Sequence, residues 1–246
     1  MSRMANVTNE RVGKEQFQIR MLGSLRVTGP YGQVKWRTVK SGELFAYLYL
    51  HRTVAVDRIL DEVFLDGKTD NPKGYLHTTI YQLRKSLAAS GLSESVVISC
   101  DQGSYRLEVQ NLESDIEAFE RAASRTASDQ ETLWEAVGLY GGGLLEGVES
   151  LWVIERRERY RRQVMGMGSR LAGLLETQGA VRHALEVVQK LHRHDPGNGS
   201  LAFHVARLYQ QLGHRGLADD YVERYLLRYR EEWGFEAERP RLVYSG

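Results

Sequence analysis

The chain has 246 residues, of which 42% are hydrophobic and 26% charged, and its formal net charge is +1 at pH 7. This composition is that of a soluble globular protein with one large domain or two of ordinary size, and it excludes a disordered or fibrous chain. No apolar run approaches the roughly eighteen residues of a membrane span. The polar N-terminus lacks the apolar stretch of a secretory signal, and the one cysteine, Cys100, excludes an internal disulfide framework. We therefore expect a cytoplasmic protein with no membrane partner.

The small net charge hides an asymmetry along the chain. Residues 17–109 hold 12 Lys and Arg against 9 Asp and Glu, a net charge of +3. Residues 110–246 hold 18 against 21, a net charge of −3, and residues 1–16 add 3 against 2. A modest basic excess in the N-terminal part is compatible with nucleic-acid binding but does not demonstrate it.

The N-terminal part mixes short alternating segments with helical ones. Residues 17–27 alternate as a strand interrupted at Gly23, a turn follows at 29–32, and a second short strand is expected at 33–37. Helical apolar periodicity then marks 41–51, 56–64 and 72–89, and Pro72 suits the first turn of the third helix. Residues 96–100 and 105–109 are predicted strands of a hairpin, with Gly103 in its loop. Strands, three helices and a terminal hairpin are the element order of a winged helix.

The rest of the chain is nearly all helical. Helix-period apolar positions mark the segments 115–127, 130–140, 152–178, 181–193, 201–212 and 217–230. Gly179 and Gly213, and likewise Ala184 and Ala218, are 34 residues apart, as are Leu174 and Leu208, and Pro196 closes the first unit. Small residues at helix turns and crossings with this period are typical of tetratricopeptide repeats.

The predicted fold is therefore an α+β N-terminal winged helix followed by an all-α tetratricopeptide-like helical repeat domain. We place a loose N-terminal arm at 1–16, the winged helix at 17–112 and the helical domain at 113–246.

The third helix carries the strongest functional pattern. At 100° per residue, Leu76, Ile80, Leu83 and Leu87 fall within about 60° of one another and form its core stripe. No acidic residue occurs from 71 to 89, although Asp and Glu are 32 of the 246 residues. The polar and basic side chains away from the stripe suit base edges and phosphates of a duplex. The candidate DNA-binding residues of this helix are Lys73, His77, Thr78, Tyr81, Gln82, Arg84 and Lys85.

Taken alone, such a face is equally well a solvated helix surface with a chance deficit of acids. The hairpin that follows favours the DNA interpretation, because Gln102, Ser104 and Arg106 supply a second contact surface along the backbone or the minor groove. We expect Thr78 and Gln82 to read bases, and Lys73, Lys85 and Arg106 to contact phosphates.

Four segments together resemble an OmpR-type winged helix: Leu22-Gly-Ser-Leu-Arg-Val27, Val56-Asp-Arg-Ile-Leu60, 76–87 and Gly103-Ser-Tyr-Arg-Leu107. More narrowly, the chain resembles the Streptomyces antibiotic regulatory protein family, in which this winged helix is fused to a bacterial transcriptional activator domain. Residues 139–147 and 231–236 are similar to that domain's entry loop and closing segment.

The resemblance implies that residues 73–85 enter the major groove, and that the protein activates transcription by holding RNA polymerase holoenzyme near a promoter. It also implies binding to direct repeats, often with a second copy of the chain alongside. Tyr81 and Gln82 stand where Arg is common in the family, and Phe64 replaces a usual Trp, so no target sequence carries over. Some relatives carry a receiver domain in front, and whether this chain is a whole regulator or an output fragment stays open.

Patterns that suggest an enzyme are weak. Gly67-Lys68-Thr69 resembles the end of a phosphate-binding loop, but the glycine required five positions earlier is Glu62. Gly166 and Gly168 lie in a predicted helix and lack the strand that a dinucleotide site needs. The histidines have no Cys or carboxylate at ligand spacing. We therefore predict no catalytic residue, no metal site and no cofactor.

Residues 155–162 form the densest charge cluster. It is either a solvated helix face with internal Glu–Arg pairs, which we favour, or a surface for DNA or polymerase. We expect residues from about 114 onward to contact polymerase or a second copy. The competing hypotheses are a protein-interaction adaptor whose winged helix is only structural, and an enzyme.

Overall fold

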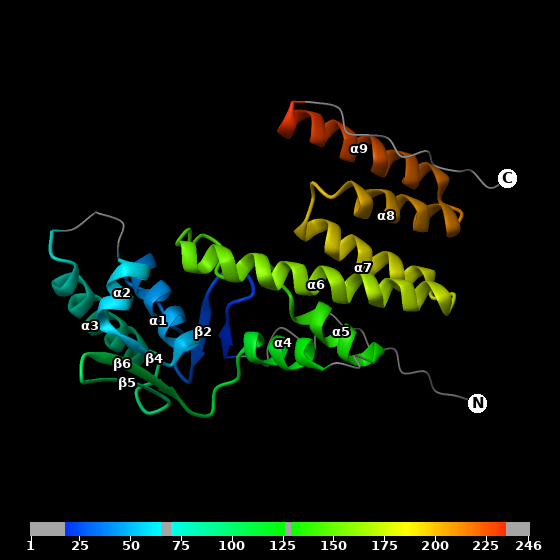
Figure 1. The fold of residues 1–246 in the computed structure, drawn as a ribbon. Helices are drawn as coiled ribbons and strands as arrows, with labels where there is room; N and C mark the ends of the chain where they lie inside the picture. The colour runs from blue at the N-terminus through cyan, green and yellow to red at the C-terminus, as the bar shows by residue number, and fades with distance from the viewer. Residues whose placement is uncertain (1–17, 65–69, 126–128, 235–246) are drawn as a thin grey trace, which may run out of the picture. The chain divides into compact units, whose positions relative to one another are not determined.

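The computed structural model describes residues 18–64, 70–125 and 129–234 (Figure 1). The expected N-terminal arm lies outside these residues, as do 235 and 236 of the closing segment. The described residues pack as two compact units. The first holds the residues up to 121 together with 138–160, and the second holds those of 122–137 and from 161 onward.

The first unit begins with a small antiparallel sheet in the order β1-β2-β3: β1 is Ile19–Arg20, β2 is Arg26–Gly29 and β3 is Gly32–Gln33. The expected single strand at 17–27 is two strands, because Ile19 pairs with Val27 and the chain reverses between them. Gly23 lies in this reversal with φ of +116°, a conformation that favours glycine. The second predicted strand ends at Gln33 rather than at residue 37.

Three helices and a second sheet complete the winged helix, as predicted (Figure 1). The helices are α1 (Val39–His51), α2 (Val56–Val63) and α3 (Pro72–Ala89). The hairpin strands β5 (Val96–Asp101) and β6 (Ser104–Val109) are joined by β4 (Thr53–Ala55), and the sheet order is β4-β6-β5. Strand β4 was not expected, because three residues between two helices leave no periodicity to detect.

The first sheet is held by a buried carboxylate from a later part of the chain. Asp115 begins α4 (Asp115–Ser124) and is only 5% exposed. Its two carboxylate oxygens accept the backbone N–H groups of Met21 and Leu22, each at 2.9 Å. Burial raises the pKa of the Asp115 carboxyl, and these N–H donors act in the opposite direction.

A glycine-rich loop extends this contact. The N–H of Gly23 donates to the carbonyl of Gly143 at 3.0 Å, and the N–H of Leu145 donates to the carbonyl of Met21 at 2.9 Å. Leu144 and Leu145 are completely buried. Residues 141–145, expected only to form a loop, therefore pair with the reversal between β1 and β2.

Helix α6 (Leu151–Thr177) enters the same core at its start. The indole N–H of Trp152 donates to Glu43 of α1 at 3.2 Å, and the Trp152 ring meets the Tyr47 ring edge-on with centroids 5.0 Å apart. Glu43 is 3% exposed and also pairs with Lys40 at 2.9 Å. The start of α6 and the winged helix thus share one hydrophobic core.

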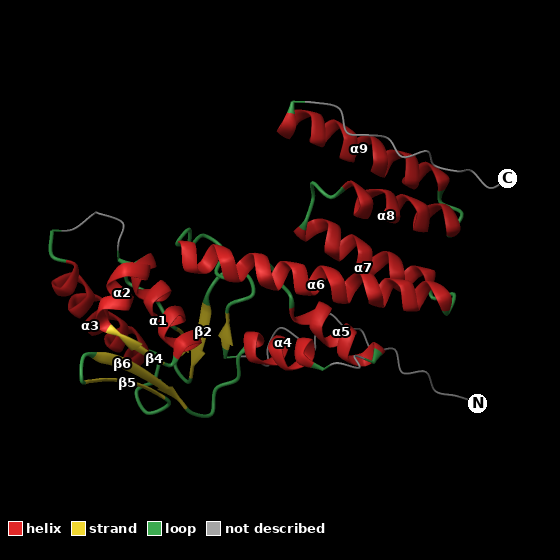
Figure 2. Cartoon of the chain, in the orientation of Figure 1, coloured by secondary structure: helices red, strands yellow, loops and turns green. Residues whose placement is uncertain are grey.

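The second unit is helical (Figure 2). Besides parts of α4 and α6 it contains most of α5 (Gln130–Leu139), then α7 (Val181–His194), α8 (Gly199–Gln211) and α9 (Arg215–Trp233). None of the helices within the described ranges is both long and apolar enough to cross a membrane.

The predicted helical repeat is confirmed in this unit. Gly179 and Gly213 both have positive φ, +73° and +80°, in the turns that follow α6 and α8. Ala184 and Ala218 are both completely buried, one in α7 and one in α9. A glycine at each turn and an alanine at each crossing allow the helices of a pair to approach closely.

We predict that Asp115→Ala lowers the free energy of unfolding by about 2 kcal/mol, because it leaves two buried N–H groups without an acceptor. Urea denaturation followed by circular dichroism measures this loss. Glu94→Ala, which removes an exposed carboxylate from the same unit, is the control and should change stability by less than about 0.5 kcal/mol. Equal stabilities of the two variants would contradict the role given to Asp115.

Candidate nucleic-acid interface

Helix α3 begins where its sequence predicts. The Asn71 side chain accepts the N–H of Gly74 at 2.9 Å and so caps the helix, and Pro72 occupies the first turn. The predicted core stripe is confirmed, since each of its four residues is at most 3% exposed. Thr79 is buried as well, and its hydroxyl donates to the Tyr75 carbonyl.

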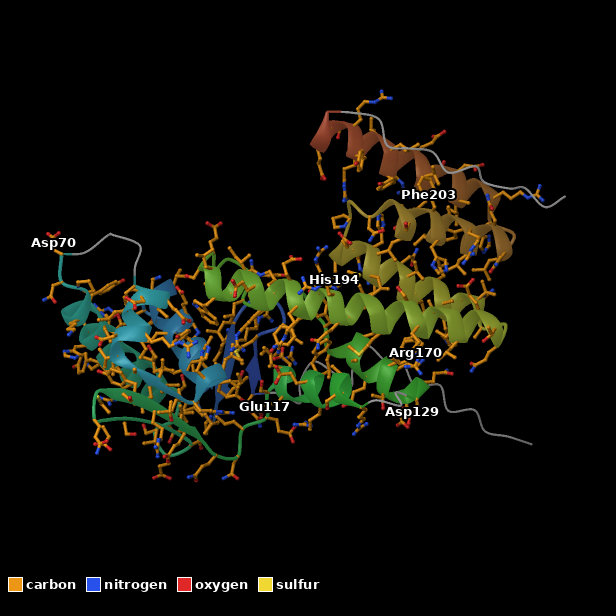
Figure 3. All side chains as sticks on the ribbon, in the orientation of Figure 1. Asp70, Glu117, Asp129, Arg170, His194 and Phe203 are labelled. Carbon is orange, nitrogen blue, oxygen red and sulfur yellow. The ribbon has the colours of Figure 1, made fainter. Side chains whose placement is uncertain are left out.

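The opposite face of α3 is exposed and contains no acidic residue from 71 to 89. His77, Thr78, Tyr81, Arg84 and Lys85 are exposed, with Tyr81 at 58%, and Gln82 is half-buried. Asp70, labelled in Figure 3, is the last acidic residue before the helix. The structure thus places the predicted candidates of α3 on one accessible surface.

Two of these side chains have local contacts that limit what they can do. The Thr78 hydroxyl donates to the Gly74 carbonyl at 3.0 Å, so toward a base edge it offers an acceptor and a methyl group. The Lys85 ammonium lies 5.1 Å from the centre of the Tyr81 ring, a cation–π distance. Lys85 and Tyr81 are therefore presented together on this face.

Arg84 differs from its neighbours. Its guanidinium donates to the backbone carbonyl of Ile98 at 2.7 Å, and Ile98 lies in β5. Because this bond links α3 to the hairpin sheet, Arg84 positions the two predicted contact surfaces relative to each other. No local sequence pattern indicates this contact, because its partner is a main-chain group of another element.

The hairpin between β5 and β6 has a two-residue turn, Gln102 and Gly103, and both residues have positive φ, 45° and 75°. This is the type I′ geometry that matches the twist of paired strands. The Gly103 carbonyl accepts the N–H of Val56 at 2.9 Å, which fixes the turn to the start of α2. Gln102 is exposed and Ser104 half-buried.

Two predicted phosphate contacts have acidic neighbours. The Lys73 ammonium lies 4.0 Å from a carboxylate oxygen of Asp57, and the Arg106 guanidinium lies 3.9 Å from Glu108. All four side chains are more than half exposed, so solvent screens both pairs. Either cation can exchange its partner for a phosphate at small cost.

Sequence reasoning missed a group of side chains beside α3. Gln33, Lys35 and Arg37 line the same groove as Tyr81, Gln82 and Lys85. The available signal was the alternation of residues 33–37, in which Val34 and Trp36 are apolar and the other three residues are polar. Only the fold brings this segment next to the helix.

The sequence patterns that suggested an enzyme have structural explanations where they fall within the described residues. Gly67-Lys68-Thr69 lies outside the described residues. A Cβ on Gly168 would lie 2.6 Å from the Leu191 side chain, so this glycine allows α7 to pack on α6. Burial lowers the pKa of His192, and Nδ1 of its ring lies 2.6 Å from the Tyr221 hydroxyl. Among the described residues, no three His, Cys, Asp or Glu side chains are arranged to hold a metal ion.

The arginines of α6 mostly contact other elements. Arg157 donates to the carbonyls of Leu144, Leu145 and Val148 at 2.8–2.9 Å, and so holds the glycine-rich loop. Arg159 pairs with Glu120 of α4 at 3.2 Å. Arg157 and Arg159 therefore bind groups outside α6, and not the glutamates of the same helix as we expected.

Comparison with known proteins identifies the family. A family model described as the bacterial transcriptional activator domain matches residues 108–242, more than half of the chain. The chain therefore belongs to this family, which confirms the resemblance to the Streptomyces antibiotic regulatory proteins.

The solved structures support the fold. A structure of Mycobacterium tuberculosis EmbR in complex with a low-affinity phosphopeptide matches with a TM-score of 0.61 at 18% sequence identity. The match covers 91% of this chain but 62% of that one, so this chain spans less than two thirds of the EmbR chain. No curated protein sequence matches this chain.

We predict that Arg84→Ala lowers the free energy of unfolding by about 1 kcal/mol, because the bond to the Ile98 carbonyl is lost. Lys85→Ala is the matched control, since it removes the next cation of the same helix and should change stability by less than about 0.5 kcal/mol. Thermal unfolding of both variants measures the difference. If Lys85→Ala proves as destabilising as Arg84→Ala, the link between α3 and β5 does not stabilise the fold.

Proposed function

We propose that this chain is a transcriptional regulator of the activator type and that it binds promoter DNA in a sequence-specific manner, with α3 in the major groove. The observation that carries the proposal is the exposed face of α3, which holds hydroxyl, amide, imidazole and basic groups and no carboxylate over 19 residues, from 71 to 89. A duplex presents base-edge donors and acceptors between two rows of phosphates, and such a face complements both. The proposal includes no catalytic step.

The side chains of α3 divide by their chemistry. Gln82 can make a two-point contact with an adenine edge, and Thr78 and Tyr81 can contact a base or a thymine methyl group. Lys73 and His77 flank this face and Lys85 lies within it, and all three suit phosphates, as does Arg106 of the hairpin. Gln102 and Ser104 would follow the backbone or the minor groove, as the wing of such a domain does.

We further propose that the helical part activates transcription by contacting RNA polymerase holoenzyme, and that two copies bind side by side on direct repeats. Residues 110–246 carry a net charge of −3 and gain little from phosphates. Stacked helix pairs such as α6–α7 and α8–α9 form extended surfaces that suit protein partners. We also propose that the DNA-binding and activating functions divide at residues 112 and 113, although residues 138–160 pack in the same compact unit as the winged helix.

The experiment must use the whole chain. Cutting after residue 112 would remove Asp115, Leu144 and Trp152, which complete the core of the first unit. Loss of binding by such a fragment would report unfolding rather than function. Point substitutions on the exposed face of α3 avoid this problem.

We predict that Gln82→Ala and Thr78→Ala each reduce discrimination between an operator, selected from random duplexes, and a scrambled duplex by about 1–3 kcal/mol. Neither side chain is in the core stripe, so both variants should fold. Titration of both duplexes at fixed salt measures the change, and Gln211→Ala, which removes an exposed neutral side chain of α8 in the second unit, is the control. Wild-type binding with unaltered discrimination in both variants would refute base reading by these residues, and would favour a winged helix that is only structural.

A further inference from the structure

A groove lies in the first unit between the C-terminal half of α3 and the segment that joins β3 to α1. It encloses about 730 Å³. Three cationic side chains line it, Lys35 and Arg37 from one wall and Lys85 from the other, and none of its lining residues is acidic. Two exposed tyrosines, Tyr31 and Tyr81, also line it.

The wall opposite α3 is built by alternation along the chain. Val34 is 3% exposed, and the Trp36 ring packs on Phe45 of α1 with centroids 5.2 Å apart. Lys35 lies between these two anchors and Arg37 follows the second. Both are exposed and line the groove, so the alternation presents them on one side. The packing of Val34 and Trp36 thus orients both Lys35 and Arg37.

This wall is fixed to α3 by hydrogen bonds. The N–H of Tyr31 donates to the Ser90 carbonyl at 3.2 Å, and the Ser86 hydroxyl donates to the Lys35 carbonyl at 2.9 Å. Gly29 allows the close approach, because a Cβ there would lie 2.1 Å from the Ser90 carbonyl oxygen. The groove is therefore formed in the chain itself, before any partner binds.

Within the described residues, neither Lys35 nor Arg37 takes part in an ion pair. Three cations around one groove with no carboxylate among them attract a polyanion. The opposite wall includes Tyr81, Gln82 and Lys85, which belong to the exposed face of α3 proposed to contact DNA. The groove is thus continuous with the proposed recognition surface.

We propose that this groove binds the sugar–phosphate backbone of the DNA strand that borders the major groove occupied by α3. Lys35 and Arg37 are its phosphate contacts, and the tyrosine hydroxyls are further donors to phosphate oxygens. The β3–α1 segment is then a third DNA contact surface, besides α3 and the hairpin. This inference rests on the proposed function. Continuity with the base-reading face favours DNA over an acidic protein segment.

The test is the salt dependence of operator binding by the full chain carrying Lys35→Ala and Arg37→Ala. Each lost phosphate contact should flatten the plot of log affinity against log salt by about 0.9, so the double variant should lose about tenfold less affinity than wild type between about 50 and about 200 mM salt. Discrimination between operator and scrambled duplex should not change. The variant carrying Lys35→Arg and Arg37→Lys keeps both charges and should keep the wild-type slope.

Arg182→Ala, which removes an exposed cation of α7 in the second unit, controls for net charge and should leave the slope unchanged. If wild type binds the operator and the double alanine variant has the same slope, the inference is overturned while the proposed function stands. If that variant binds DNA normally but fails to activate in a reconstituted transcription assay, the groove binds a protein and the inference is also overturned. If wild type binds no duplex even at low salt, both the proposed function and this inference are overturned.

Discussion

The buried carboxylate of Asp115 joins the two ends of the winged helix. It accepts two backbone N–H groups from the reversal between β1 and β2, where the sheet would otherwise leave them buried and unpaired. Because Asp115 is also the first residue of α4, the start of the helical part of the chain is fixed to the first sheet. The pairing of Leu145 with Met21 and the bond of Trp152 to Glu43 continue this contact along the chain.

One consequence is that the winged helix does not end with its hairpin. Residues 138–160 belong to the same compact unit, although the family model for the activator domain begins at residue 108. Arg157 of α6 shows why, since its guanidinium binds the carbonyls of the loop that pairs with the first sheet. A change in α6 near Arg157 can therefore reach the first sheet without passing through a flexible linker.

The proposed contact surfaces are held by main-chain groups. Arg84 links α3 to β5, the Gly103 carbonyl links the hairpin turn to α2, and Ser86 links α3 to the segment before α1. Each link leaves the neighbouring exposed side chains available for a ligand. Such support reduces the cost of ordering the surface on binding, which is how a modest number of contacts can discriminate between sequences.

Local patterns predicted much of this structure. The Asn71 cap, Pro72 and the apolar stripe located α3, and the 34-residue spacing of Gly179 and Gly213 located the helix pairs. Interactions between distant residues could not be predicted in this way. Strand β4 exists because Val54 and its neighbours pair with β6, and no local pattern marks it. Lys35 and Arg37 adjoin α3 only because Gly29 lets the turn between β2 and β3 pack against Ser90.

The central claim is that α3 reads base edges in the major groove. The most direct measurement is binding of the full chain to its selected operator with single base analogues. Replacing guanine by 7-deazaguanine removes an acceptor from the major groove only, and replacing guanine by inosine removes a donor from the minor groove only. We expect 7-deazaguanine or uracil-for-thymine substitutions to weaken binding by about tenfold at two or more positions of each repeat. Sensitivity to inosine alone, with no effect of the major-groove analogues, would contradict the claim.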